Sequence, residues 1–136
     1  MSDNIHRADF FNDHRAHRLF DIFPSLEGQV TVSNVSANQF SGWHRHEKQY
    51  DLFAVIEGSL NIGVITETGA ISVVKLSRGE SIRINTGDWH CYHSGSTPAT
   101  LIYYLSRKHD EQDEFRATEE EMLEKYNFKM YPPADE

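Results

Sequence analysis

Short apolar runs, separated by glycine-containing turns, dominate the chain from residue 29 onward. β-Branched and aromatic residues gather in runs of about four to eight positions, and in 59–66 apolar and polar side chains alternate as in a half-buried strand. Turn signals such as those at 67–69 and 86–88 separate the runs. This succession of short strands predicts an all-β sandwich or barrel. A small closed barrel can hold one ligand in its mouth.

The first 28 residues lack this alternation. Aromatic and aliphatic residues flank a charged segment at 13–18, for which the sequence predicts a turn or a short helix. Pro24 argues against a helix through the end of this region. We therefore expect residues 1–28 to be an irregular arm that packs across a sheet edge or against a partner subunit.

The C-terminal end carries the signature of one short helix. Thr118 and Glu121 have the spacing of a capping box, and apolar residues at helical spacing follow them. Asn127 and a later pair of prolines end the pattern, so a helix is predicted over 118–126. The expected organisation is therefore an N-terminal arm over 1–28, a small barrel over 29–116, and a helix with a tail over 117–136.

Composition and charge exclude several partners. The 136 residues fit one domain, and the single cysteine, Cys91, excludes an internal disulfide. Residues 110–136 hold ten acids and three bases, so −7 of the net charge of −8 lies there. No basic stripe indicates a nucleic-acid partner. The N-terminus has no apolar signal segment, and no apolar run reaches the roughly 20 residues of a membrane helix, so we expect a cytoplasmic protein without a membrane partner.

Two segments contain residues that bind metals or transfer protons. His44 and His46 are two positions apart, so on a strand both imidazoles lie on one face. Asp51 follows five residues later, and His90 comes shortly after a second glycine turn. Two histidines and a carboxylate with open positions suit Fe(II), and the wider donor set suits other divalent transition metals. The same side chains could instead serve as acid and base. The sequence therefore predicts a metal or acid–base cluster.

These two segments resemble the two motifs of the cupin superfamily. The spacings H-x-H-x4-D-x6-G and G-x5-N-x-G-x2-H-x3-S follow the cupin pattern, with Asp51 where the family has Glu. The resemblance implies a small antiparallel jelly-roll barrel, often dimeric, with a pocket inside. In metal-binding cupins the matching residues are the ligands of Fe, Mn, Ni or Zn. By this resemblance the ligands would be His44, His46, Asp51 and His90.

Residues 10–116 also resemble the dTDP-4-dehydrorhamnose 3,5-epimerase family and its short relatives. The resemblance rests on G-W-H at 42–44, on G-D-W-H at 87–90, and on D-E-F-R at 113–116. It implies proton transfer on a nucleotide-linked keto sugar without a metal. The histidine base matches His44 and the proton-returning tyrosine matches Tyr103, while His90 would lie on the pocket wall and steady the enolate.

Three functions remain open on these residues. The first is an epimerase or isomerase acting on a nucleotide-linked keto sugar, with Gln49, Lys48 and Arg83 expected to contact the substrate. The second is a metal-dependent cupin enzyme, an oxygenase or isomerase, which the carboxylate of Asp51 favours because the epimerase family has Lys there. The third is a cupin that binds a metabolite without catalysis. For any of the three, the aromatic arm and the sheet edges predict a homodimer.

Overall fold

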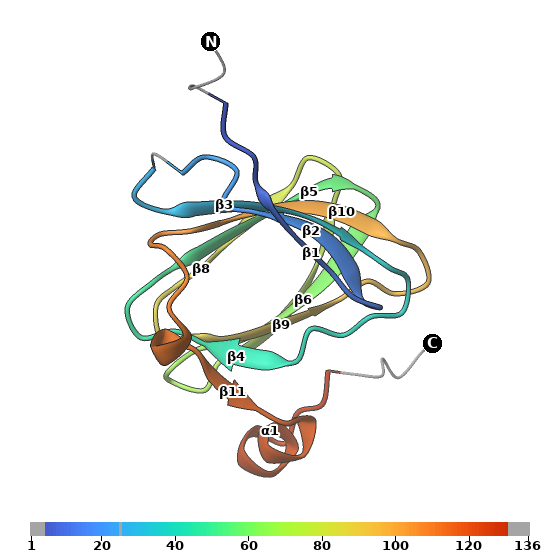
Figure 1. Ribbon diagram of the computed structural model, residues 1–136. Coiled ribbons are helices and arrows are strands. Elements are labelled where there is room, and N and C mark those ends of the chain that lie inside the picture. The colour runs from blue at the N-terminus through green and yellow to red at the C-terminus, as the bar shows by residue number, and fades with distance from the viewer. Residues whose placement is uncertain (1–4, 25, 131–136) are drawn as a thin grey trace.

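The computed structural model describes residues 5–24 and 26–130, and it consists of two antiparallel sheets that face each other (Figure 1). The end of the expected tail, residues 131–136, lies outside the described residues. One short helix completes the fold, and the predicted all-β class is confirmed. The strands are β1 (Asp9–Asn12), β2 (Ala16–Phe20), β3 (Gln29–Val35), β4 (Trp43–Arg45), β5 (Asp51–Glu57), β6 (Ser59–Ile65), β7 (Ile71–Ser77), β8 (Ser81–Ile84), β9 (Trp89–His93), β10 (Ala99–Leu105) and β11 (Phe115–Ala117); the helices are the 3-10 turn η1 (Glu111–Asp113) and α1 (Glu119–Tyr126).

The strand order shows many crossovers between the sheets. One sheet has the order β1-β2-β3-β10-β5-β8 and the other has the order β11-β4-β9-β6-β7. Strands distant in sequence pair with each other, as when β10 lies between β3 and β5. From β3 to β11 the chain passes from one sheet to the other at every step except between β6 and β7, which is the arrangement of a jelly roll.

Apolar side chains between the two sheets form the main core. β5 and β6 are joined by Gly58, which has a positive φ and lies so close to the backbone of Pro98 that a Cβ would clash with its carbonyl oxygen. A residue with a side chain would therefore open this corner of the barrel. The most deeply buried members of the core include Val55, Leu60, Ile62, Ile84 and Leu101.

The N-terminal region differs from the irregular arm expected from the sequence. β1 and β2 form a hairpin that extends the six-stranded sheet, because β2 pairs with β3 over residues 16–19. The backbone amides of Arg15 and Ala16 donate to Asp13 Oδ1 and hold the turn. The expected turn or short helix at 13–18 is thus a turn followed by a strand. The hairpin extends the edge of the sheet, and its strands depend on the distant partner β3, which local sequence does not reveal.

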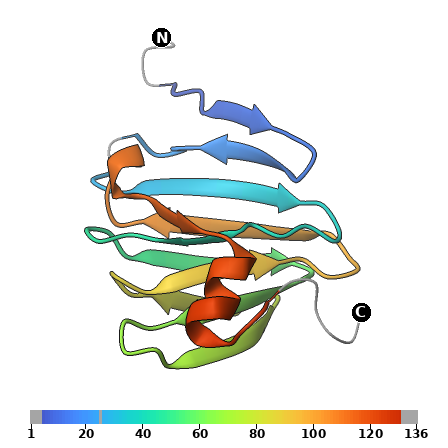
Figure 2. The same ribbon diagram turned by 90° about the horizontal axis from the view of Figure 1, so that it is seen from below.

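The C-terminal helix has the predicted capping box. Thr118 accepts the amide of Glu121, and the Glu121 carboxylate accepts the amide of Thr118. Figure 2 shows α1 lying across the outside of the barrel. There Met122 and Met130 pack with Trp43 on the face of the five-stranded sheet that points away from the main core. Among the described residues, no helix has the length and apolar character needed to cross a membrane.

Candidate metal centre

Strands from both sheets bring the four predicted ligands together. His44 on β4 lies directly opposite His90 on β9 in the five-stranded sheet. Asp51 begins β5 in the six-stranded sheet and is 2 % exposed, because alternation along β5 turns it to the same side as Phe53. His46 lies one residue beyond the end of β4 and is also buried. The cluster of His44, His46, Asp51 and His90, here called the tetrad, thus joins the two sheets inside the barrel.

The tetrad is compact. Its potential ligand atoms all lie within 4.8 Å of one another. Asp51 Oδ2 is 3.1 Å from His90 Nε2 and 3.5 Å from His46 Nε2. The other oxygen, Oδ1, accepts a hydrogen bond of 2.7 Å from Gln49 Nε2. Gln49 therefore fixes the carboxylate so that its second oxygen faces both imidazoles.

Hydrogen bonds on the far side of the rings assign their protons. His46 Nδ1 lies 2.7 Å from the carbonyl oxygen of Asp113, and His90 Nδ1 lies 3.1 Å from that of Asp88. A carbonyl only accepts, so each Nδ1 carries the hydrogen and each neutral ring turns the lone pair of Nε2 inward. Both lone pairs then face the same carboxylate oxygen. Such a set of acceptors needs a proton or a cation between them, and ligating histidines in metal sites are oriented in this way.

Electrostatic interactions push the pKa values of the tetrad apart. Burial lowers the pKa of His44 well below its ordinary value, and the neighbouring His90 and His46 lower it further. Burial also opposes the charge on His46, but the hydrogen bond and charge of Asp51 outweigh it and raise the pKa of His46. The pKa of Asp51 is held far below its ordinary range, against the effect of burial, by His46 and His90. Asp51 therefore remains a carboxylate that attracts a positive charge.

The donor set fits a divalent transition metal. Three imidazoles and one carboxylate suit Fe, Mn, Ni or Zn. Ligands at about 2.1 Å from one ion lie within about 4.2 Å of one another, so the donor atoms need only a slight contraction. The buried Nδ1 of His44 has no hydrogen-bond partner among the described residues. A buried polar atom without a partner is costly, and a bound ligand would remove that cost if the ring turned this atom toward it.

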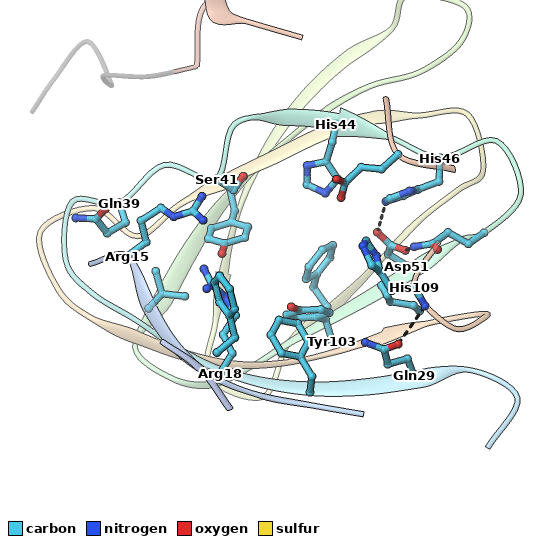
Figure 3. Close-up of a pocket in the computed structure, with 18 of the residues that line it drawn as sticks. Arg15, Arg18, Gln29, Gln39, Ser41, His44, His46, Asp51, Tyr103 and His109 are labelled. Atoms are coloured by element: carbon cyan, nitrogen blue, oxygen red, sulfur yellow. Dashed lines mark hydrogen bonds and ion pairs between the residues drawn. The ribbon is translucent and has the colours of Figure 1, made fainter. Parts of the chain in front are cut away.

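The tetrad lies beside a cavity of about 580 Å³, which is large enough for a small organic molecule. His44, His46 and Asp51 line it, together with the predicted site residues Gln49 and Tyr103. In Figure 3, His46 and Asp51 lie on one side of the cavity and Tyr103 lies on its floor. Of the three residues predicted for the catalytic role, His44 and Tyr103 therefore line the cavity, whereas His90 lies beside His44 in the tetrad but is absent from the lining.

Two predicted substrate contacts lie elsewhere. Lys48 is exposed, and its backbone amide donates to the carboxylate of Asp113. Arg83 is exposed on β8, where its guanidinium lies 3.8 Å from the ring centroid of Tyr50. The cavity lining contains neither residue. Their nearness to the motifs in sequence does not place them in the cavity, because strand alternation turns Arg83 outward and Lys48 belongs to the loop after β4.

Asp113, Arg15 and Arg18 are site residues that sequence reasoning did not identify. Besides its carbonyl contact with His46, Asp113 accepts the backbone amides of Glu47 and Lys48 through its buried carboxylate, and so holds the loop that carries His46. The D-E-F-R motif that begins at this residue was its signal. Arg15 and Arg18 line the cavity from the hairpin of β1 and β2. The sequence signal for them is the charged segment 13–18, in which two arginines face only one carboxylate, that of Asp13.

Comparisons with known proteins agree with this architecture. The capsular polysaccharide assembling protein CapF from Staphylococcus aureus superposes with a TM-score of 0.74 at 20 % identity, over 86 % of this chain and 33 % of that chain. Oxalate decarboxylase from Bacillus subtilis gives 0.72 at 11 % identity, over 90 % and 35 %. The chain thus spans about a third of the length of either solved chain, and at these identities the likeness concerns the fold.

The sequence itself assigns the family. No curated protein sequence matches the chain. The family model described as a cupin domain matches residues 31–104, which is more than half of the chain and includes the whole tetrad. This match confirms the resemblance of the two motifs to cupins, and the two facing sheets confirm the jelly-roll barrel that it implied. The chain belongs to the cupin family.

Proposed function

We propose that this protein is a metal-dependent cupin enzyme that binds a divalent transition metal through the tetrad and a small organic substrate in the adjoining cavity. One observation carries the proposal: two inward-facing Nε2 atoms and an ionised carboxylate oxygen converge on one buried point. When bound there, Fe, Mn, Ni or Zn would supply Lewis acidity, and Fe could also supply oxygen chemistry.

The chain's own residues would position the substrate and hold its protons. Gln49 and the carbonyl of Asp113 keep Asp51 and His46 in place. Burial raises the pKa of Tyr103, so its hydroxyl stays protonated at neutral pH and can donate to a substrate oxygen. Phe53 lines the same cavity and packs beside Tyr103, with ring centroids 5.6 Å apart. These features support a site that binds a polar molecule in a partly apolar pocket.

Metal content tests the proposal. Protein purified without chelator should contain about one equivalent of a transition metal by elemental analysis, and His46→Ala should lose it. His109→Ala is the matched control, because His109 lines the same cavity but lies outside the tetrad. Protein that contains no metal and takes up none from solution would refute the proposal. So would equal metal contents in His46→Ala and the wild type.

The second candidate is an epimerase of a nucleotide-linked keto sugar. It is supported by the joint presence of His44 and Tyr103 at one cavity, where burial keeps His44 neutral and Tyr103 protonated. The likeness to a capsular polysaccharide assembling protein agrees with a sugar substrate. A carbon-bound proton next to the keto group would pass to His44, and Tyr103 would return one. Incorporation of solvent deuterium into a 4-keto sugar nucleotide by metal-free protein would favour this candidate, whereas substrate-induced stabilisation without metal or exchange would favour a non-catalytic binder.

A further inference from the structure

The hairpin of β1 and β2 places two arginines at the cavity, opposite the tetrad. Figure 3 shows Arg15 and Arg18 on one side and His46 and Asp51 on the other. Arg18 is 9 % exposed, although arginine is seldom buried without a partner. Both arginines lie outside the segment 31–104 that the cupin model matches, so they belong to this chain's N-terminal extension of the barrel.

One carboxylate serves both arginines. Asp13 Oδ2 accepts Arg15 Nε at 3.2 Å and Arg15 Nη2 at 2.9 Å, while Asp13 Oδ1 accepts the backbone amides of Arg15 and Ala16. Arg18 Nη1 reaches the same Oδ2 only at 3.6 Å, which is beyond hydrogen-bond distance. Two guanidinium groups thus interact with one carboxylate, and the more deeply buried one, that of Arg18, lies farther from it.

The other contacts of Arg18 do not neutralise it. Its guanidinium carbon lies 5.6 Å from the ring centroid of Phe11. The guanidinium also donates a hydrogen bond to the hydroxyl of Tyr92, which is a neutral partner. Ser33, opposite Arg18 in the pairing of β2 with β3, has a fully buried hydroxyl with no hydrogen-bond partner among the described residues. Ser33 lies outside the cavity lining, so the cost that an oxygen-rich anion in the cavity would relieve is that of the buried cation.

The other carboxylates that line the cavity are paired elsewhere or exposed to solvent. Glu114 accepts two hydrogen bonds from Arg116, and Asp51 belongs to the tetrad. Asp9 is exposed on β1. In the described part of the chain, the ion pair of Arg18 is with Asp13 and not with any of these carboxylates.

We infer that Arg18, supported by Arg15, binds a carboxylate or phosphate group of the substrate at the end of the cavity opposite the tetrad. The planar guanidinium fork matches the paired oxygens of either group. Both ends line one cavity of about 580 Å³, so a single small molecule can be held by its anionic group at Arg18 while its other end meets Tyr103 and the tetrad. This inference rests on the proposal that the cavity is the substrate site, and it names the substrate class as a small organic anion.

Titration with inorganic phosphate and with succinate tests the inference. Both anions are titrated by calorimetry at constant ionic strength, into protein as purified and into protein whose metal has been removed and whose chelator has been dialysed away. We expect saturable binding of at least one anion by both forms, and a loss of about tenfold or more in Arg18→Met. Phosphate binding alone assigns a phosphate-bearing substrate, and succinate binding alone assigns a carboxylate.

Arg78→Met is the matched control, because Arg78 loses the same charge at a site where its side chain is 77 % exposed and outside the cavity lining. It should bind the anions as the wild type does. Failure of both anions to bind, or equal binding by Arg18→Met and the wild type, overturns the inference. The metal proposal fails separately, through the absence of metal from the tetrad, and that failure does not alter anion binding by the metal-free form.

Two further measurements remain decisive if Arg18→Met does not fold. Arg18→Lys keeps the charge but loses the fork, and should bind with intermediate affinity. In the wild type, the Nε–Hε resonance of Arg18 should shift saturably with the anion while that of Arg78 does not. Binding that leaves the Arg18 resonance unmoved would place the anion elsewhere and overturn the inference.

Discussion

Asp51→Asn is the substitution that most sharply separates a metal site from a proton-transfer site. Asparagine keeps the shape of the side chain, and its amide oxygen can still accept the 2.7 Å hydrogen bond from Gln49. Its amide nitrogen would then take the place of Oδ2, which lies 3.1 Å from His90 Nε2 and 3.5 Å from His46 Nε2. The two amide hydrogens would satisfy the two lone pairs that now face the carboxylate.

The expected consequence is a folded protein that no longer holds the metal. Outer hydrogen-bond partners of metal ligands contribute about 10–100-fold to affinity, and Asp51 is itself an expected ligand and the only carboxylate of the tetrad. We therefore expect metal affinity to fall by at least about 100-fold. The melting temperature of the metal-free protein should change little, because the new amide group can donate hydrogen bonds to Nε2 of both His46 and His90.

Asp51→Glu is the matched control for this prediction. It restores the residue that stands at this position in the cupin pattern, one methylene longer, and keeps the negative charge. We expect it to retain one equivalent of metal. Competition with a chromophoric chelator measures the affinities of the three proteins, and elemental analysis gives their stoichiometry. Equal affinity of Asp51→Asn and the wild type would show that the carboxylate is not a ligand and would refute the reasoning.

Three further predictions concern the support of the site and the ends of the chain. Asp113→Asn should lower unfolding free energy by about 1–3 kcal/mol and metal affinity several-fold, measured by urea unfolding and metal titration, because the backbone amides of Glu47 and Lys48, in the loop that carries His46, lose their charged acceptor. Thr118→Ala should cost about 1 kcal/mol in urea unfolding through loss of the helix cap, with metal affinity unchanged. Burial opposes ionisation of Asp13, but the hydrogen bonds from Arg15 hold its pKa far below its ordinary range. The stabilising effect of this carboxylate, which Asp13→Asn lacks, should therefore be present above about pH 4 and be lost as the pH falls below it, measured by thermal unfolding across pH.

Each of these three predictions has a contradicting result. Wild-type stability in Asp113→Asn would mean that its carboxylate does not hold the loop. A change of metal affinity in Thr118→Ala would link the outer helix to the site, which the separate packing of α1 does not predict. A stability deficit of Asp13→Asn that persists unchanged below pH 3 would show that the lowered pKa of Asp13 is not its source.

Local sequence was sufficient for the barrel and for the tetrad. Strand alternation and the fixed spacings around Gly58 and Gly87 constrain which side chains face inward, and both glycines have the positive φ that their turns require. His44 and His46 were expected on one face, and His90 was expected from a second strand pair. The strand register places His44 opposite His90, which explains how the two motifs form one cluster.

Pairing between distant strands explains what local sequence did not predict. β1 has four exposed residues and no pattern that distinguishes it from a loop, and it becomes a strand because β2 and β3 provide an edge for the hairpin. The cavity role of Arg18 depends on that same pairing. Arg83, in contrast, follows the motifs closely in sequence but points outward from β8, so closeness along the chain was a poor guide to the cavity lining.

The most direct test is the anomalous scattering of a crystal of protein purified without chelator and grown without added metal. At the absorption edge of the metal found by elemental analysis, we expect one peak at about 2.0–2.3 Å from donor atoms of His44, His46, Asp51 and His90. No peak in the tetrad, with Asp51 hydrogen-bonded directly to protonated His46 and His90, would contradict the assignment of a metal centre. A single peak elsewhere in the molecule would contradict it equally.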